Sequence, residues 1–181
     1  MLDKNMKKEE IEKELNGKGD FVQLDWINRL LKESVPLAIK KLLYLRLAEI
    51  YARKSMPLEE ARMYDNVAIL CSTFSEKMKF YVREAKVLIK SMHFEKVEPA
   101  IKKAMSQANA SERNEISIEI KNEYKKQAEN LILEKKKNAA CKMYEKLLET
   151  NISDLERTEI KTKLKSLCDD LGKKSKSVIL K

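Results

Sequence analysis

The sequence contains few of the residues from which tight turns and many catalytic sites are built. Among its 181 residues are three glycines, three prolines, one tryptophan and one histidine. Phosphate-cradling loops and two-residue β-hairpin turns depend on glycine, so the sequence has little material for either. This scarcity favours long helices joined by short connections.

Cysteine is equally sparse. Cys71, Cys141 and Cys168 are odd in number and widely spaced, and no Cys-x-x-Cys or Cys/His cluster occurs. The pattern predicts free thiols in a reducing cytoplasm. Because no apolar run approaches the length of a transmembrane helix, we also expect no membrane insertion.

Catalytic and cofactor-binding motifs are missing as well. The single histidine, His93, lies in a predicted turn, where a solvated or structural role is the usual one. No G-x-x-x-x-G-K, G-x-G-x-x-G, H-E-x-x-H or G-x-S-x-G motif occurs. We therefore expect a protein that is not an enzyme, with no catalytic residue, no metal site and no cofactor.

The residues that are abundant are helix formers. Charged residues make up 37% of the chain, its formal net charge is +9, and hydrophobic residues make up 43%. Lysine, glutamate, leucine, isoleucine and alanine dominate, and apolar residues recur every three or four positions. The sequence thus predicts an all-α protein with a charged, basic surface.

Start and stop signals divide the chain into about nine helices. The expected N-caps are Asp20, Thr73, Ser111 and Ser153. Pro99 lies early in the sixth helix and predicts a later start or a bend there. The expected helices cover about residues 3–15, 20–33, 37–53, 57–70, 73–90, 94–108, 111–134, 139–149 and 153–171.

Small residues recur at a fixed spacing along this helical pattern. Two of the pairs are twelve residues apart and one is thirteen, and we assign the extra residue to the turn at 55–57. A small side chain lets the two helices of a hairpin approach closely where they cross. The spacing therefore predicts three helical hairpins. The pairs are Ala48–Ala61, Ala85–Val97 and Ala128–Ala140.

These residues resemble the tetratricopeptide repeat family, whose units are paired helices of about 34 residues. The stretches LAEIY (47–51) and EEARMYDNVA (59–68) carry the resemblance, which covers roughly 37–150 in three units. The family's early Trp and Gly and its closing Pro are missing. From Ala48 to Ala85 is 37 residues and from Ala85 to Ala128 is 43, and we place the difference in the loop SQANASERN. The resemblance implies a right-handed array of antiparallel helical hairpins, a TPR-like α–α superhelix.

An array of this kind needs covered ends. We divide the chain into an N-terminal helical pair at 1–35, three hairpins at 36–150, a capping helix at 151–172 and a flexible basic tail at 173–181. The first pair is either a cap, with Phe21 and Trp26 facing inward, or a separate arm. The capping helix presents an apolar stripe of Leu155, Ile160, Leu164 and Leu167.

In paired-helix arrays the first helix of each pair lines a concave face. We therefore predict a non-catalytic interaction or assembly module that binds an acidic or amphipathic peptide or partner helix in a groove. Ordinary packing between units is the alternative role of each groove residue. The candidates are Leu45, Glu49, Ala52 and Arg53 in the first unit, Val82, Lys86, Ile89 and Lys90 in the second, and Lys125, Glu129 and Ile132 in the third.

Some tetratricopeptide modules bind a chaperone's C-terminal carboxylate through lysine and asparagine. Leu45 and Glu49 stand at the positions where the first unit would need them, so we do not expect that ligand. An adaptor in vesicle traffic or of the proteasome type, built from similar hairpins, is a further possibility.

Nucleic-acid binding is the main alternative function. A basic stripe with interleaved Phe80 and Tyr81 follows the fifth helix and continues on the sixth, and phosphates favour such a stripe. Lysine, however, far outnumbers the arginine that usually reads bases, and no RNA-binding motif is present. The stripe comprises Lys77, Lys79, Arg83, Lys86, Lys90, Lys102 and Lys103.

Overall fold

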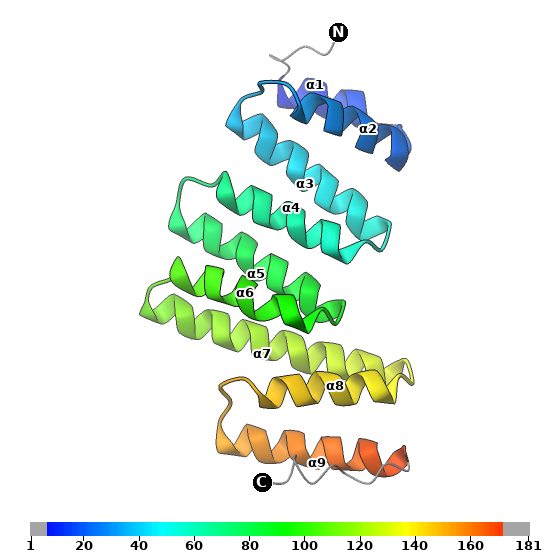
Figure 1. Cartoon of the computed structure of the whole chain (residues 1–181), viewed down its shortest axis with the longest axis vertical. Helices are drawn as coiled ribbons and strands as arrows, with labels where there is room; N and C mark the ends of the chain where they lie inside the picture. The colour runs from blue at the N-terminus through cyan, green and yellow to red at the C-terminus, as the bar shows by residue number, and fades with distance from the viewer. Residues whose placement is uncertain (1–6, 172–181) are drawn as a thin grey trace.

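The computed structural model describes residues 7–171, and all regular structure in this range is α-helical. Its nine helices stack in chain order along the long axis, which confirms the predicted all-α array of antiparallel hairpins (Figure 1). None of them is long and apolar enough to span a membrane. They are α1 (Lys8–Leu15), α2 (Asp20–Leu31), α3 (Leu37–Arg53), α4 (Pro57–Ile69), α5 (Phe74–Lys90), α6 (Phe94–Ser106), α7 (Ala110–Leu133), α8 (Lys137–Leu148) and α9 (Asp154–Asp170). The start of the predicted first helix and the predicted tail at 173–181 lie outside the described residues.

One turn type closes all three hairpins. Between α5 and α6, Met92 has a φ of 62°, its N–H donates to the Ile89 carbonyl, and the N–H of His93 donates to the Leu88 carbonyl. These two bonds define a Schellman turn, which satisfies carbonyls at a helix end. The turns at Ser55 and Lys135 have the same bonds and a similar positive φ, although none of the three residues is glycine.

The first two hairpins match in length element by element. Helices α3 and α5 have 17 residues each, and α4 and α6 have 13 each. Helix α7 has 24 residues, so the longer step to the third hairpin comes from two added helical turns. The prediction of a loop at SQANASERN is therefore wrong, since only residues 107–109 separate α6 from α7.

Two helix starts also differ from the prediction. Asn109, not Ser111, caps α7, because its side chain accepts the Glu112 N–H and the Glu112 carboxylate accepts the Asn109 N–H. Gly19 precedes α2, and Asp20 is its first residue. Helix α6 starts near the predicted Phe94, with Pro99 inside it, so the later start that Pro99 suggested does not occur.

The small residues at the predicted crossings are all buried, as the spacing rule requires. The three turns have equal length, however, so the partner position of Ala48 lies twelve residues further on, as in the other hairpins. That residue is Glu60 and not Ala61. The assignment of an extra residue to the first turn is thus wrong. Glu60 occupies the place that Val97 and Ala140 hold in the other hairpins.

The N-terminal pair packs against the array. Ile11 and Leu15 of α1 are buried in one apolar cluster with residues of α2, α3 and α4. Trp26 is partly buried there, but Phe21 is 75% exposed, so its predicted inward orientation is wrong. A bond from Arg53 to Asp20 ties the start of α2 to the end of α3, and Lys54 Nζ lies 3.6 Å from the centre of the Phe21 ring.

At the other end, α9 closes a second cluster that extends from α4. Ser153 caps α9 as predicted, and Ile160, Leu164 and Leu167 are buried. Leu155 is 86% exposed, against prediction. It precedes Ile160 by five residues, which turns it about 140° away from the buried stripe.

Candidate functional site

The first helices of the hairpins, α3, α5 and α7, carry three hollows in series. The N-terminal hollow, about 490 Å³, lies between α1, α2 and α3. The central hollow, about 500 Å³, lies between the α3–α4 turn, the end of α5 and Glu123 of α7. The C-terminal hollow, about 280 Å³, lies between α5 and α7. Lys86 lines both the central and the C-terminal hollow, so these two adjoin.

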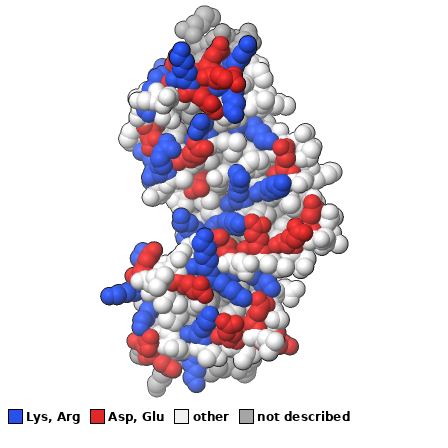
Figure 2. All heavy atoms as spheres, turned by 180° about the vertical axis from the view of Figure 1, so that it is seen from behind, with Lys and Arg blue, Asp and Glu red and all other residues white. Residues whose placement is uncertain are grey.

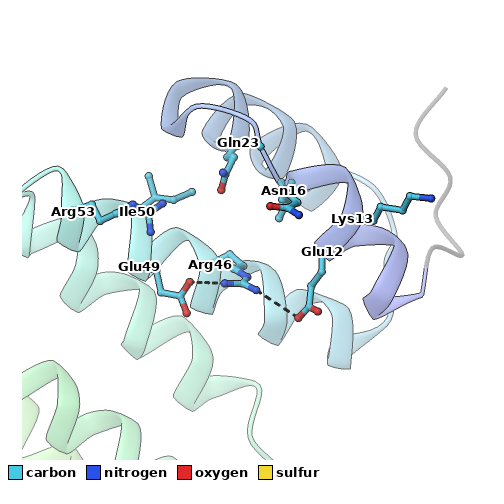
Figure 3. A pocket seen from close by; sticks show the side chains of 10 residues that line it. Glu12, Lys13, Asn16, Gln23, Arg46, Glu49, Ile50 and Arg53 are labelled. Atoms are coloured by element: carbon cyan, nitrogen blue, oxygen red, sulfur yellow. Dashed lines mark hydrogen bonds and ion pairs between the residues drawn. The ribbon is translucent and has the colours of Figure 1, made fainter.

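Most charged side chains of the N-terminal hollow are paired, while Lys13 points away from them (Figure 3). Arg46 lies between two carboxylates, 2.8 Å from Glu49 on its own helix and 3.5 Å from Glu12 of α1. At the far end Arg53 donates to Asp20 at 2.7 Å. These bonds hold α1 and α2 to α3, so their first effect is to fix the N-terminal pair in place.

The central hollow combines apolar walls with charges. Ala52, Met56, Pro57 and Val87 supply the apolar surface, and four charged side chains line it as well. In Figure 1 the α5–α6 turn is set back from the turns on either side, and the hollow lies at this step. The charged residues are Glu60, Lys86, Lys90 and Glu123.

Glu60 is a half-buried charge of this hollow, as are Lys86 and Glu123. Burial raises the pKa of the Glu60 carboxyl above the ordinary value, and the positive charge of Lys90 offsets only part of the rise. Within the described residues, the Glu60 carboxylate has neither a hydrogen bond nor an ion pair, whereas its backbone N–H donates to the Met56 carbonyl. A cation delivered by a ligand would therefore find a half-buried carboxylate that no other described side chain neutralises by direct contact.

The C-terminal hollow has walls of opposite charge. Met78, Val82 and Ile116 form its floor. Lys86 of α5 forms an ion pair with Glu119 of α7 across it. The basic wall is Lys79, Arg83 and Lys86, and the acidic wall is Glu112, Glu115 and Glu119.

Comparison with known protein families, curated proteins and solved structures finds no match for this chain. Its own geometry is therefore the basis for any functional proposal. Within residues 7–171, no three histidine, cysteine, aspartate or glutamate side chains are placed to hold a metal ion together.

The predicted groove residues separate into three groups. Glu49 and Arg53 line the N-terminal hollow, and Lys86 and Lys90 line the central one. Exposed Ala52 lines the central hollow as well. These five residues line hollows, and their binding of a partner stays a prediction.

A second group lies beneath that face. Val82 forms part of the floor of the C-terminal hollow but is 5% exposed, and Ile89 is completely buried. Val82 thus faces α7 at the bottom of the hollow, and the complete burial of Ile89 removes it from the groove. Leu45, the equivalent of Val82 in α3, is half-buried and lines none of the three hollows.

The third group is engaged by α9. Lys125 lies 2.9 Å from Glu156, and Glu129 lies 4.0 Å from Lys163. Lys121 also bonds Glu156, at 3.2 Å. Ile132 packs half-buried against the second cluster. For these residues the geometry favours packing between units, which is the alternative that the sequence left open.

Two features of this face were missed at the sequence level. Glu60 could have been found by counting twelve residues from Ala48. The acidic row on α7 was visible as a spacing of three, four and four residues, which places its members on one helical face. The row consists of Glu112, Glu115, Glu119 and Glu123.

The basic stripe of α5 and α6 is interrupted by acidic partners. Lys103 contacts Asp65 at 2.7 Å and Glu84 at 3.3 Å, and Phe80 stacks on Tyr64. In Figure 2 positive and negative side chains are interspersed over the visible face instead of forming one basic field. A phosphate backbone would meet carboxylates along much of the stripe.

Proposed function

We propose that this protein is a non-catalytic interaction module that binds an amphipathic segment of a partner protein along α3 and α5. The observation that carries the proposal is the series of three hollows on the first-helix face. Apolar floors and charged rims of both signs suit a helix or peptide with mixed polar and apolar faces. The resemblance to tetratricopeptide repeats supports the same use.

The binding segment is expected to avoid the side of α7 that α9 engages. Helix α9 lies against α7 and engages Lys121 and Lys125 through Glu156. By contrast, α3 keeps Glu49 and Ala52 exposed, and α5 keeps Lys79, Arg83 and Lys90 exposed. The open part of the face thus coincides with the hollows.

The charge pattern favours a protein partner over nucleic acid. Nucleic-acid sites present clustered cations to a row of phosphates. On this face Lys86 is paired with Glu119, and the acidic row of α7 runs beside the basic residues of α5. A partner protein can offer both signs of charge, whereas a polyanion offers one.

The proposal includes a reducing compartment such as the cytoplasm. Within the described residues, Cys71, Cys141 and Cys168 are buried and form no disulfide with one another. Buried cysteines of this kind pack as small apolar side chains. Proteins of oxidising compartments more commonly use cysteine in disulfides.

A charge-reversal experiment tests the binding face. The variant Lys79→Glu/Arg83→Glu alters the α5 rim, and Lys96→Glu/Lys142→Glu makes the same charge change at exposed positions of α6 and α8. Each protein is immobilised and the partners captured from native cell extract are quantified by mass spectrometry. We expect the rim variant to capture at least about tenfold less of its specific partner, as when central contacts of an interface are lost. The control variant should capture as much as the unmodified chain.

Equal capture by both variants would refute the proposed face. A parallel titration with polyuridylic acid distinguishes the nucleic-acid alternative. If RNA binds with an affinity that survives moderate salt and falls only in the rim variant, the partner class is wrong.

A further inference from the structure

The central hollow exists because the first hairpin departs from the other two at two equivalent positions. Ala52 stands where α5 has Ile89 and α7 has Ile132. Glu60 stands where α6 has Val97 and α8 has Ala140. Both departures line the same hollow.

The first departure creates space. Ile89 is completely buried in the second cluster, so an isoleucine at this position fills the space beside its helix. An alanine side chain has three fewer carbons than an isoleucine side chain, and Ala52 is exposed at the side of the hollow. Met56, 40% exposed, and Val87 complete an apolar wall beside it.

The second departure creates an unmet charge. Glu60 extends from the first turn of α4 into the hollow and is half-buried. In the described part of the chain its carboxylate has no hydrogen bond and no ion pair. A carboxylate in this setting is stabilised by any cation that reaches it.

The other charged groups around the hollow differ from Glu60. Lys86 is held by Glu119, and Glu123 accepts a hydrogen bond from the Gln127 side chain at 2.6 Å. Lys90 is exposed at the rim and is not in ion-pair contact with Glu60. Of the two charged side chains that line the hollow without a hydrogen bond or ion pair among the described residues, Lys90 is exposed and Glu60 is half-buried, so the more enclosed one is a carboxylate.

We propose that the central hollow binds an arginine or lysine side chain of the partner segment, with its aliphatic stem along Ala52, Met56 and Val87 and its cationic head at Glu60. The stem of such a side chain covers apolar surface while its head keeps a polar partner. The volume of about 500 Å³ lies in the range of sites that enclose small ligands. The inference rests on the proposed function for the identity of the binding face.

Direct titration tests the hollow without knowledge of the partner. The full chain, ¹³C-labelled at methionine methyl groups, is titrated with N-acetyl-arginine amide, and the Met56 methyl resonance is followed by NMR. N-acetyl-glutamate amide and N-acetyl-glutamine amide serve as acidic and neutral probes. We expect saturable, millimolar binding of the arginine probe, while the glutamine probe binds at least about fivefold more weakly, as the loss of one charge-assisted bond implies.

Three variants make the test specific. Glu60→Gln should weaken the arginine probe at least about fivefold, since it removes the carboxylate charge. Ala52→Ile should abolish the shift by filling the hollow with the residue found at the equivalent positions 89 and 132. Lys90→Gln should strengthen binding, because it removes the like charge from the rim. Should Ala52→Ile not fold, the opposite signs of the Glu60 and Lys90 variants still decide the question.

The proposal is overturned if the glutamate probe shifts the Met56 methyl resonance more strongly than the arginine probe does. It is equally overturned if Lys90→Gln weakens binding of the arginine probe. It is also overturned if folded Ala52→Ile binds arginine as the unmodified chain does. If one of these results occurs while Lys79→Glu/Arg83→Glu still loses its partner, the proposed function stands and only the role of the central hollow is refuted. Loss of the proposed function would show instead as undiminished capture by that rim variant.

Discussion

The hairpins α3–α4 and α5–α6 share one backbone plan and differ in how they meet their neighbours. Their helices have equal lengths, their turns have the same hydrogen bonds, and Ala48 and Ala85 are buried at equivalent positions. Yet Ile89 is buried against the next unit while its equivalent Ala52 is exposed. A few small residues and a turn therefore specify the hairpin. Other positions, such as 52 and 89, decide whether the face of its first helix is buried or accessible to a ligand.

The same contrast separates Val97 from Glu60. Val97 is 2% exposed in the second hairpin, whereas Glu60 is half-buried at the edge of a hollow in the first. The framework tolerates a charge at this position only where the neighbouring first helices leave room. This makes the first hairpin the more open unit and the second the more tightly packed one.

Transferring the glutamate to the second hairpin gives the largest expected effect. We expect Val97→Glu to lower the free energy of unfolding by about 3–5 kcal/mol, since it leaves an unpaired charge in a closed site. Urea denaturation followed by circular dichroism measures it. Lys96→Glu, at the exposed neighbouring position, is the control and should change stability by less than about 0.5 kcal/mol. A loss below about 1 kcal/mol in Val97→Glu would mean that the two hairpins do not differ here.

Overpacking a crossing gives the next largest effect. We expect Ala85→Leu to destabilise the protein by about 1–3 kcal/mol, because no space remains where α5 and α6 approach. The matched change Ala52→Leu, on an exposed alanine of the first hairpin, should stay within about 0.5 kcal/mol. If the two leucine variants lose equal stability in thermal unfolding, the alanine spacing does not mark a crossing.

Much of this fold could be predicted from the sequence. The helix over Leu37–Arg53 was placed correctly at both ends, and the capping box at Ser153 was recognised, because local hydrogen-bond chemistry fixes such starts. Asn109 was overlooked because Ser111 is an equally good cap by residue type. Only the bond between Asn109 and Glu112 in the folded chain distinguishes them.

The binding face was harder to predict, because the exposure of a residue on the first helix of one hairpin depends on how closely the next hairpin packs against it. Val82 and Ile89 have the same helical phase as Leu45 and Ala52, so periodicity alone cannot separate buried from open positions. Likewise nothing local to Lys125 shows that Glu156 of α9 will reach it. Side-chain size at the unit junctions, Ala52 against Ile89, carries the information that spacing does not.

The three turns offer a smaller test of the shared framework. A residue other than glycine at positive φ is strained, so Ser55→Gly and Lys135→Gly should each stabilise the protein by about 0.5–1 kcal/mol. Met92→Gly should gain less, because the Met92 side chain packs against the second cluster and that contact is lost. Thermal unfolding of the three variants checks this order. An equal gain at all three turns would show that the Met92 side chain contributes nothing.

The smallest expected effect is the pH dependence of stability that two carboxylates contribute. Glu60 lies in the central hollow, and Glu156 lies at the junction between α7 and α9. Bonds from Lys125, the Ser153 backbone and Lys121 lower the pKa of Glu156 from 4.5 to about 2. A lowered pKa adds stability above the ordinary value, and that stability is lost as the pH falls from 4.5 toward 2. Glu156→Gln should therefore be less stable than the unmodified chain at pH 7, with a difference that shrinks on acidification.

Glu60 should show the opposite sign. Burial raises its pKa, so its ionised form disfavours the folded state at neutral pH, and the penalty disappears as the pH falls through the raised value. Glu60→Gln should thus be slightly more stable than the unmodified chain at pH 7 and equal to it in acid. Thermal unfolding of both variants between pH 7 and pH 2.5 measures the two trends. If Glu60→Gln loses stability at pH 7 as Glu156→Gln does, the carboxylate of the central hollow is already paired, and a partner's cation would gain nothing by reaching it.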